Sequence, residues 1–255
     1  MILDRFSLRN KCGIVTGAGS GIGKALATGL AEAGAKVALA GRDLEKLNAA
    51  ASEMVAAGLQ AEPFQVDMAE PESIAALMAS VQRAFGRIDF LFNNAGMIHR
   101  APAQNFPLDK WEEMIKVNLT GPFILSQAVA RQMITQGIRG SIVNTSSLIA
   151  VFGGIGVPAY AATKGGITQL TKSLCNDLGQ YGIRVNAIGP GWVRTEMTAA
   201  IQTNAERFKA ISSRIPLGRW AEPHDLAGLA VFLASDASAY ITGQVIFIDG
   251  GYMAM

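Results

Sequence analysis

The chain has 255 residues, of which 50% are hydrophobic and 16% are charged. This composition supplies enough apolar surface for a sizeable core, and we expect a single domain over residues 1–255. The net charge is +2 with no block of basic residues, which argues against nucleic acid as a partner. No apolar run approaches the roughly 20 residues that cross a bilayer, so no membrane association is expected either.

The cysteines and the N-terminus indicate the cell compartment. Two cysteines and two histidines do not form a zinc-ligand pattern, so we expect no metal site. Cys12 and Cys175 fall in a predicted strand and a predicted helix, which is typical of buried thiols in a reducing cytoplasm. Polar residues follow Met1 too early for a signal peptide, so we expect a cytoplasmic protein.

Strand-like and helix-like segments alternate along the whole chain. The predicted strands cover residues 12–16, 36–40, a segment ending near 66–67, 88–92, 141–145, 183–188 and 244–248. The predicted helices cover residues 22–33, 43–57, 71–85, about 107–136, a stretch reaching about 180, and 222–234, whereas 190–216 is predicted to be irregular. Repeated β-α-β units of this length predict an α/β Rossmann fold, a doubly wound parallel seven-stranded sheet with helices on both faces. Ligands of such sheets bind at the carboxyl ends of the strands.

Tyr160 and Lys164 lie one helical turn apart and are predicted to share one face of a helix. A lysine cation beside a tyrosine favours the phenolate, so we expect Lys164 to lower the pKa of Tyr160. Such a tyrosine could donate or accept a proton at a carbonyl or carbinol oxygen. Most isolated pairs of this spacing are ordinary surface neighbours, and the interpretation therefore depends on further motifs.

A glycine-rich turn, Thr16-Gly-Ala-Gly-Ser-Gly-Ile-Gly23, joins the first predicted strand to the first predicted helix. Gly17 permits a tight turn, Gly21 lets the backbone approach a phosphate, and Gly23 lets the helix pack closely. The helix N-terminus then offers free N–H groups and a positive dipole end to a pyrophosphate. The spacing is Gly-x-x-x-Gly-x-Gly and not the commoner Gly-x-Gly-x-x-Gly.

Together these motifs resemble those of the short-chain dehydrogenase/reductase family. The resemblance runs from about Leu8 to Tyr252, with all motifs in the order typical of the family. It rests on Thr16, Gly17, Gly21, Gly23, Asn93-Asn-Ala-Gly96, Asn118, Ser147, Tyr160, Lys164 and Pro190-Gly191.

The resemblance implies reversible hydride transfer between an alcohol and a nicotinamide. Tyr160 would be the acid or base, and Lys164 would lower its pKa and bind the nicotinamide ribose. The family's serine precedes the tyrosine by thirteen residues, which selects Ser147 over the neighbouring Ser146 as the group that holds the substrate oxygen. Asn118 would organise a water that connects the lysine to solvent, and an asparagine bonded to nearby backbone is compatible with that role.

The same resemblance implies a set of cofactor-binding residues. Asp67 is equally well interpreted as a turn residue, whereas Asn94 would meet the adenosine ribose and Val193 and Thr195 the nicotinamide carboxamide. The full set is Gly17, Gly19, Ser20, Gly21, Ile22, Gly23, Arg42, Asp67, Met68, Asn94, Ala95, Gly96, Tyr160, Lys164, Pro190, Gly191, Val193 and Thr195.

The end of the second predicted strand bears on the choice of cofactor. An acidic residue there would bond a ribose 2′-hydroxyl, but the chain has Gly41 and Arg42. A guanidinium pairs well with phosphate oxygens, which favours NADP over NAD. Asp43 follows at once, and an Arg42 stacked near the adenine would also permit NAD.

Four segments resemble the gluconate 5-dehydrogenase and 2-deoxygluconate 3-dehydrogenase branch of the family, which oxidises sugar acids. They are residues 96–102, 156–160, 214–220 and 249–252. His99 and Arg100 follow the Asn-Asn-Ala-Gly turn, and a cation there could hold a carboxylate, although surface charges are common and both could instead be exposed loop residues, possibly at a subunit contact. Residues 97–105 and 190–216 are expected to line the substrate pocket, and Trp192 could form the floor of that pocket or simply pack in the core.

The motifs also bear on two alternative functions and on the expected assembly state. A ketone reductase of the same family, acting on 3-oxoacyl carrier proteins, would want a basic docking patch, and none is evident. A non-catalytic dinucleotide-sensing regulator would be expected to lack part of the set Ser147, Tyr160 and Lys164. The resemblance implies a homotetramer built on the Tyr160 helix, the long helix before it and the C-terminal strand.

Overall fold

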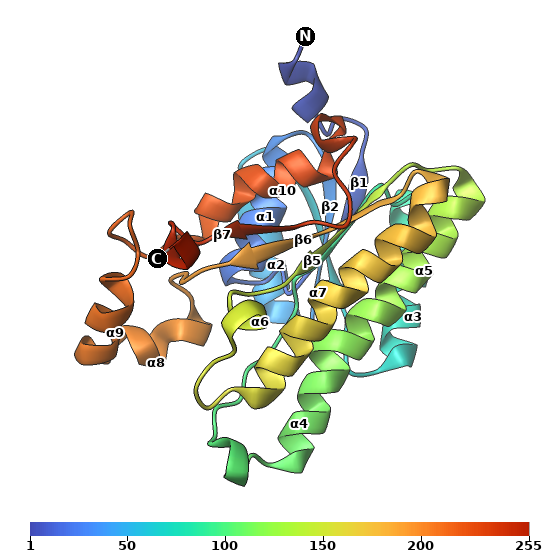
Figure 1. The fold of residues 1–255 in the computed structure, drawn as a ribbon. Coiled ribbons are helices and arrows are strands. Elements are labelled where there is room, and N and C mark those ends of the chain that lie inside the picture. Colours follow the sequence, from blue (N-terminus) through green and yellow to red (C-terminus); the bar gives the residue numbers. More distant parts are fainter. Residues whose placement is uncertain (255) are drawn as a thin grey trace.

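The computed structural model describes residues 1–254 and contains a seven-stranded parallel sheet of strand order β3-β2-β1-β4-β5-β6-β7 (Figure 1). This confirms the predicted fold class. The strands are β1 (Cys12–Thr16), β2 (Lys36–Gly41), β3 (Gln60–Gln65), β4 (Phe90–Asn93), β5 (Ser141–Thr145), β6 (Arg184–Pro190) and β7 (Val245–Ile248). The helices are α1 (Gly21–Glu32), α2 (Leu44–Ala56), α3 (Pro71–Phe85), α4 (Leu108–Ile115), α5 (Gly121–Gln136), α6 (Ile149–Phe152), α7 (Pro158–Leu178), α8 (Ala199–Gln202), α9 (Ala205–Ser212) and α10 (Ala227–Ala234).

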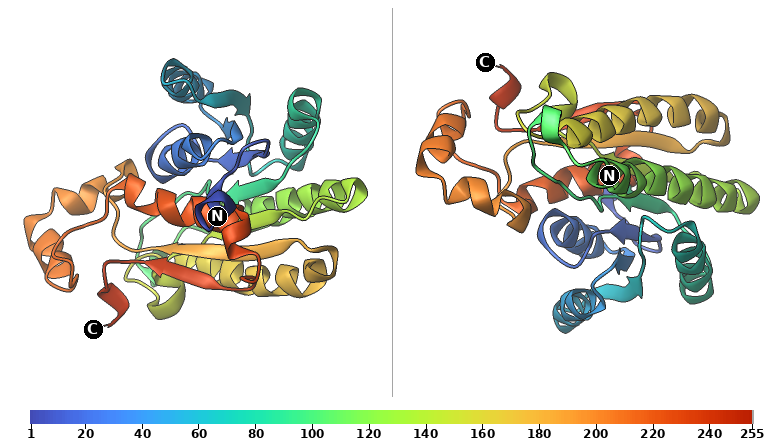
Figure 2. Two further views of the ribbon diagram at one scale, coloured as in Figure 1. Left: turned by 90° about the horizontal axis from the view of Figure 1, so that it is seen from above. Right: turned by 90° about the horizontal axis from the view of Figure 1, so that it is seen from below.

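Helices cover both faces of the sheet, as Figure 2 shows from above and below. Side chains of α1, α2 and α10 form a core on one face, and those of α3, α5 and α7 form a second core on the other. The central strands β1 and β4 are buried along their whole length because apolar side chains are needed on both faces. The sheet is therefore a rigid platform for the loops at its carboxyl edge.

Three predicted helices differ in detail from the structure. The long helix predicted after residue 107 is interrupted by a π-helical turn, Lys116–Thr120, between α4 and α5. The first turn of the predicted helix 222–234 is a 3₁₀ turn, Pro223–Leu226, which Pro223 opens. The helix that carries Tyr160 ends at Leu178, and a 3₁₀ turn, Gly179–Tyr181, follows it.

The stretch 190–216, predicted to be irregular, is in fact largely helical. It contains a 3₁₀ turn, Glu196–Thr198, and the short helices α8 and α9. These helices are held by their own small apolar cluster, in which Trp220 stacks on Phe208 at 5.0 Å between ring centroids. Proline and glycine in this stretch break long periodicity, but they do not prevent single helical turns that pack on aromatic side chains.

Within residues 1–254, no helix is both long and apolar enough to cross a membrane. In the same part of the chain, no group of three His, Cys, Asp or Glu side chains is placed to hold a metal ion. Cys12 is buried, and Cys175 is half-buried beside Thr242.

Candidate active site

A cavity of about 910 Å³ lies at the carboxyl edge of the sheet, where the loops after β1, β2, β4, β5 and β6 meet. Every residue predicted for the cofactor and substrate lines this cavity. Of the predicted catalytic residues, Ser147, Tyr160 and Lys164 line it and Asn118 does not. The fold thus brings side chains more than a hundred residues apart into one site.

The glycine-rich turn forms one wall of the cavity. Gly17 and Gly21 have φ angles of +66° and +52°, which side chains rarely adopt. A Cβ added to Gly23 would lie 2.1 Å from the carbonyl oxygen of Gly17, so any larger residue there would push α1 away from the turn. Ser20 precedes the helix and makes no side-chain capping bond to it, which leaves the first N–H groups of α1 available. This is a cradle that fits the pyrophosphate of a dinucleotide.

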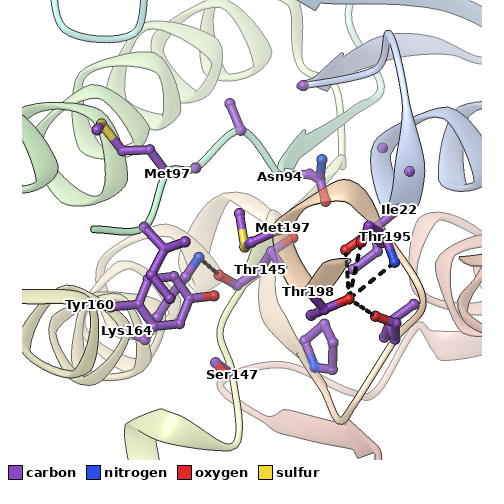
Figure 3. Close-up of a pocket in the computed structure, with 18 of the residues that line it drawn as sticks. Ile22, Asn94, Met97, Thr145, Ser147, Tyr160, Lys164, Thr195, Met197 and Thr198 are labelled. Atoms are coloured by element: carbon purple, nitrogen blue, oxygen red, sulfur yellow. Dashed lines mark hydrogen bonds between the residues drawn. The ribbon is translucent and has the colours of Figure 1, made fainter. Parts of the chain in front are cut away.

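Thr16 ties the glycine-rich turn to the loop after β4. Its hydroxyl accepts hydrogen bonds from the backbone N–H groups of Asn94 and Ala95, both at 3.0 Å. The Asn94 side chain donates to the Thr16 carbonyl, also at 3.0 Å. Asn94 is therefore held at the groove, and Figure 3 shows it among the residues that line the cavity.

At the adenosine end, Arg42 is exposed and makes no ion pair within residues 1–254. The Asp43 carboxylate accepts a bond from the backbone N–H of Lys46 at 3.1 Å and so caps α2. Asp67 lines the cavity and also caps its own turn, accepting from the Ala69 N–H at 2.9 Å. The two interpretations of Asp67 are therefore compatible.

Tyr160 and Lys164 project from the first turns of α7 and face the carboxyl end of β5. The Lys164 ammonium donates to the Thr145 carbonyl at 2.6 Å and lies 5.5 Å from the centre of the Tyr160 ring. In Figure 3 these two residues lie on one side of the cavity, with Thr195 and Thr198 on the other. Ser147 follows β5, and its hydroxyl accepts from the Ile149 N–H at 3.2 Å. An acid or base, a cation and a hydroxyl thus converge where a reacting oxygen could bind.

The pKa of Tyr160 differs in direction from the sequence prediction. Burial raises it, and the Ser147 hydroxyl and the Arg100 charge only partly oppose that rise. The net direction of the Tyr160 pKa is upward although the Lys164 ammonium lies beside the ring, and the lowering influence of Lys164 stays a prediction. Burial also lowers the pKa of Lys164 itself, to about 8, so that Lys164 loses its proton at a lower pH than a surface lysine does.

The buried Asn118 lies behind the cavity, in the π-helical turn. Its side-chain oxygen accepts from the Met97 N–H at 2.8 Å, and its amide donates to the Met97 carbonyl at 2.9 Å. Asn118 also donates to the Thr163 hydroxyl, at 3.4 Å. It therefore fixes the loop after β4 against α7, next to Lys164. Its role toward a water remains a prediction.

The substrate end of the cavity is bounded by two arginines and a tryptophan. Burial is the main cause that lowers the pKa of Arg100. The nearby charge of Arg207 lowers it further, and that of Tyr160 raises it. Trp192 lines the cavity and also packs on Trp220 at 5.3 Å between ring centroids, so lining the cavity and packing in the core are compatible. The buried indole N–H of Trp192 has no hydrogen-bond partner in the part of the chain that is described. His99 does not line the cavity, because its ring packs edge-on against Phe106.

The sequence did not point to three polar residues of this site. Arg207 on α9 lines the cavity from a stretch predicted to be irregular, and Lys46 and Glu196 face each other across its mouth. The general prediction that residues 190–216 line the pocket covered Glu196 and Arg207 as a group, without singling either out. Lys46 carried no signal, because a lysine in the first turns of an exposed helix is common.

Known proteins share this architecture over the full chain. Residues 17–253 match a family model described as enoyl-(acyl carrier protein) reductase. A 2-dehydro-3-deoxy-D-gluconate 5-dehydrogenase of Pseudoalteromonas atlantica is 44% identical and covers 99% of both chains. The chain belongs to the short-chain dehydrogenase/reductase family. A gluconate 5-dehydrogenase of Gluconobacter oxydans is 41% identical, covering 97% of this chain and 96% of the relative.

A solved structure extends the likeness to the fold. The gluconate 5-dehydrogenase of Burkholderia cenocepacia, in complex with NADP and tartrate, superposes with a TM-score of 0.96 at 40% identity and covers all of both chains. Family membership makes this chain an NAD(P)-dependent dehydrogenase or reductase acting on CH–OH groups. The alternative of a non-catalytic regulator is therefore set aside.

Proposed function

We propose that the protein oxidises a secondary alcohol of a sugar acid of the gluconate or 2-deoxygluconate kind, with NADP as the favoured cofactor. The observation that carries the proposal is the convergence of Ser147, Tyr160 and Arg100 on one cavity. Ser147 would hold the reacting oxygen, Tyr160 would take its proton, and Arg100 would bind the carboxylate by charge-assisted bonds. The sugar acids named for the relatives support this substrate class.

The chain's own residues also support the rest of the proposal. A nicotinamide would accept the hydride. The glycine-rich turn would orient the cofactor, and Lys164, beside Tyr160, would bind the nicotinamide ribose. A carbinol proton leaving through Tyr160 needs a phenolate, which the positive charge of an oxidised nicotinamide and of Arg100 would favour. Arg42 without an acidic partner at the end of β2 supports NADP, as do the NADP-bound relatives.

A ketone reductase for acyl substrates is the second candidate. The substrate end of the cavity carries many apolar side chains, which suit an acyl chain as well as a sugar. They are Ile98, Leu148, Ile149, Phe152, Ile155, Met197 and Ile211. Few polar groups at that end could bind sugar hydroxyls, which favours this second candidate. The same assay distinguishes the two.

The deciding experiment measures reduced-nicotinamide formation with D-gluconate, 2-deoxy-D-gluconate and 2-dehydro-3-deoxy-D-gluconate, each with NAD⁺ and NADP⁺. A neutral polyol serves as the control substrate. We expect turnover of an acid, and we expect Arg100→Ala to raise KM for the acid but not KM for the polyol. Turnover of acyl ketones with NADPH, without any rate on the acids, would favour the second candidate.

A further inference from the structure

An ion pair crosses the mouth of the cofactor groove. The Lys46 ammonium, in the first turns of α2, lies 3.3 Å from one carboxylate oxygen of Glu196 and 3.5 Å from the other. Glu196 opens the 3₁₀ turn that leads into α8 and α9. Both residues line the same cavity as the glycine-rich turn, although 150 positions separate them in the sequence.

The pair sits over the glycine-rich turn. A Cβ built on Gly19 would lie 3.1 Å from the Cβ of Lys46, so the lysine stem rests on that part of the turn. A Cβ built on Gly21 would lie 3.4 Å from the methyl carbon of Thr195, the residue before Glu196. The ion pair therefore spans the stretch of backbone along which the phosphates of a dinucleotide would run.

The bond between the two side chains is easily exchanged. Lys46 is 49% exposed and Glu196 is 78% exposed, and ion pairs so open to water contribute little to stability. The 2′-phosphate of NADP, and the pyrophosphate taken as a whole, each offer more negative charge and more acceptor oxygens than a carboxylate does. An anionic ligand in the groove would therefore compete well with Glu196 for the lysine.

We propose that Lys46 is a phosphate ligand of the bound dinucleotide and that Glu196 occupies it in the cofactor-free protein. Cofactor binding exchanges the carboxylate for a phosphate and frees Glu196, and with it the turn before α8, from α2. The phosphate is the 2′-phosphate of NADP or the pyrophosphate common to both cofactors. The inference rests on the nicotinamide cofactor of the proposed function and not on its sugar-acid substrate.

The first test titrates NADPH and NADH into Lys46→Met and follows nicotinamide fluorescence. We expect NADPH affinity to fall roughly tenfold, the size of one charge-assisted hydrogen bond. An equal loss for NADH would identify the pyrophosphate, and a loss for NADPH alone would identify the 2′-phosphate. Lys24→Met is the matched control, because Lys24 pairs with Glu53 outside the cavity. Unchanged affinity for both cofactors in Lys46→Met would overturn the proposal.

The second test asks whether Glu196 acts through Lys46. Glu196→Gln should tighten NADPH binding a few-fold by releasing the lysine, and the same change should do nothing in a Lys46→Met background. Tightening that persists in the double variant would mean direct repulsion between Glu196 and the cofactor, which would overturn the exchange. Glu222→Gln is the control, because Glu222 pairs with Arg194 away from the cavity.

The two proposals fail in different ways. If the unaltered protein binds neither NADPH nor NADH, the proposed cofactor is wrong and the role of Lys46 falls with it. If the unaltered protein binds and Arg42→Ala weakens NADPH, but Lys46→Met matches the Lys24→Met control, only the role of Lys46 is wrong.

Discussion

The Tyr160 hydroxyl is the group at which the reaction's proton must enter or leave. Substituting Tyr160→Phe removes that hydroxyl and keeps the ring against which the Lys164 ammonium lies. We expect turnover to fall by roughly 10²–10⁴-fold, the usual contribution of a positioned acid or base. Cofactor affinity, measured by fluorescence titration, should change little. A variant that keeps more than about a tenth of the rate would show that another group moves the proton.

Arg100 should set the pH at which oxidation becomes fast. Oxidation needs Tyr160 as the phenolate, so its rate rises with pH through the pKa of that residue. The Arg100 charge lowers the pKa of Tyr160, against the rise that burial causes. Arg100→Ala removes the lowering influence, and we expect the rising limb of the kcat/KM profile to move to higher pH.

The pH profile is measured with a neutral alcohol, so that loss of carboxylate binding does not contribute. Arg83→Ala, on the outer surface of α3 and outside the cavity, is the matched control. A limb that stays in place in Arg100→Ala, or moves to lower pH, would show that Arg100 has no electrostatic effect on Tyr160.

At the scale of elements, the π-helical turn between α4 and α5 positions Asn118. Its side chain satisfies both the N–H and the carbonyl of Met97, next to the cavity. Asn118→Ala leaves both groups without that partner, which should lower the free energy of unfolding by about 1–3 kcal/mol. We also expect kcat to fall, because the loop after β4 is no longer fixed against α7.

Denaturant unfolding and steady-state rates check this expectation. Asn48→Ala is the control, because Asn48 is exposed on α2. This substitution should change the free energy of unfolding by no more than about 0.5 kcal/mol. If Asn118→Ala and Asn48→Ala unfold alike, the Met97 hydrogen bonds do not stabilise the loop.

Local patterns were enough to predict most elements. The roles of Gly17, Gly21 and Gly23 could be predicted from their spacing after a buried strand alone. The reason is that a tight turn and a close helix contact depend on neighbouring residues in the sequence. Hydrophobic periodicity likewise predicted the seven strands and the longer helices. The π-helical turn was not predictable in this way, since it continues the helical pattern and only its hydrogen bonds differ.

Properties that depend on the packed environment were beyond the sequence. The direction of the Tyr160 pKa depends on burial, which a pair of residues at helical spacing does not reveal. The Lys46–Glu196 pair and the place of Arg207 at the cavity depend on how the short helices after β6 fold back over the site. Those helices are held by Trp220 and its aromatic neighbours and not by any regular periodicity.

At the scale of the whole molecule, β7 is an edge strand whose outer side pairs with no other strand of the described residues. β7 is the last strand of the sheet, and its four apolar residues, Val245–Ile248, are all only half-buried. Leu108 and Phe123, on α4 and α5, are also exposed. An apolar edge strand and an apolar helical surface favour pairing with another copy of the chain.

We therefore predict a homotetramer, with light scattering after size exclusion giving four times the 26.8 kDa mass of the chain. Phe123→Glu places a charge on the α5 surface and should shift the mass toward a dimer or monomer, because an unpaired charge in an apolar contact is unfavourable. Val55→Glu is the matched control, since Val55 is an exposed apolar residue on α2, away from β7 and α5. A monomer in the unaltered protein, or equal masses for it and Phe123→Glu, would contradict an assembly through α5.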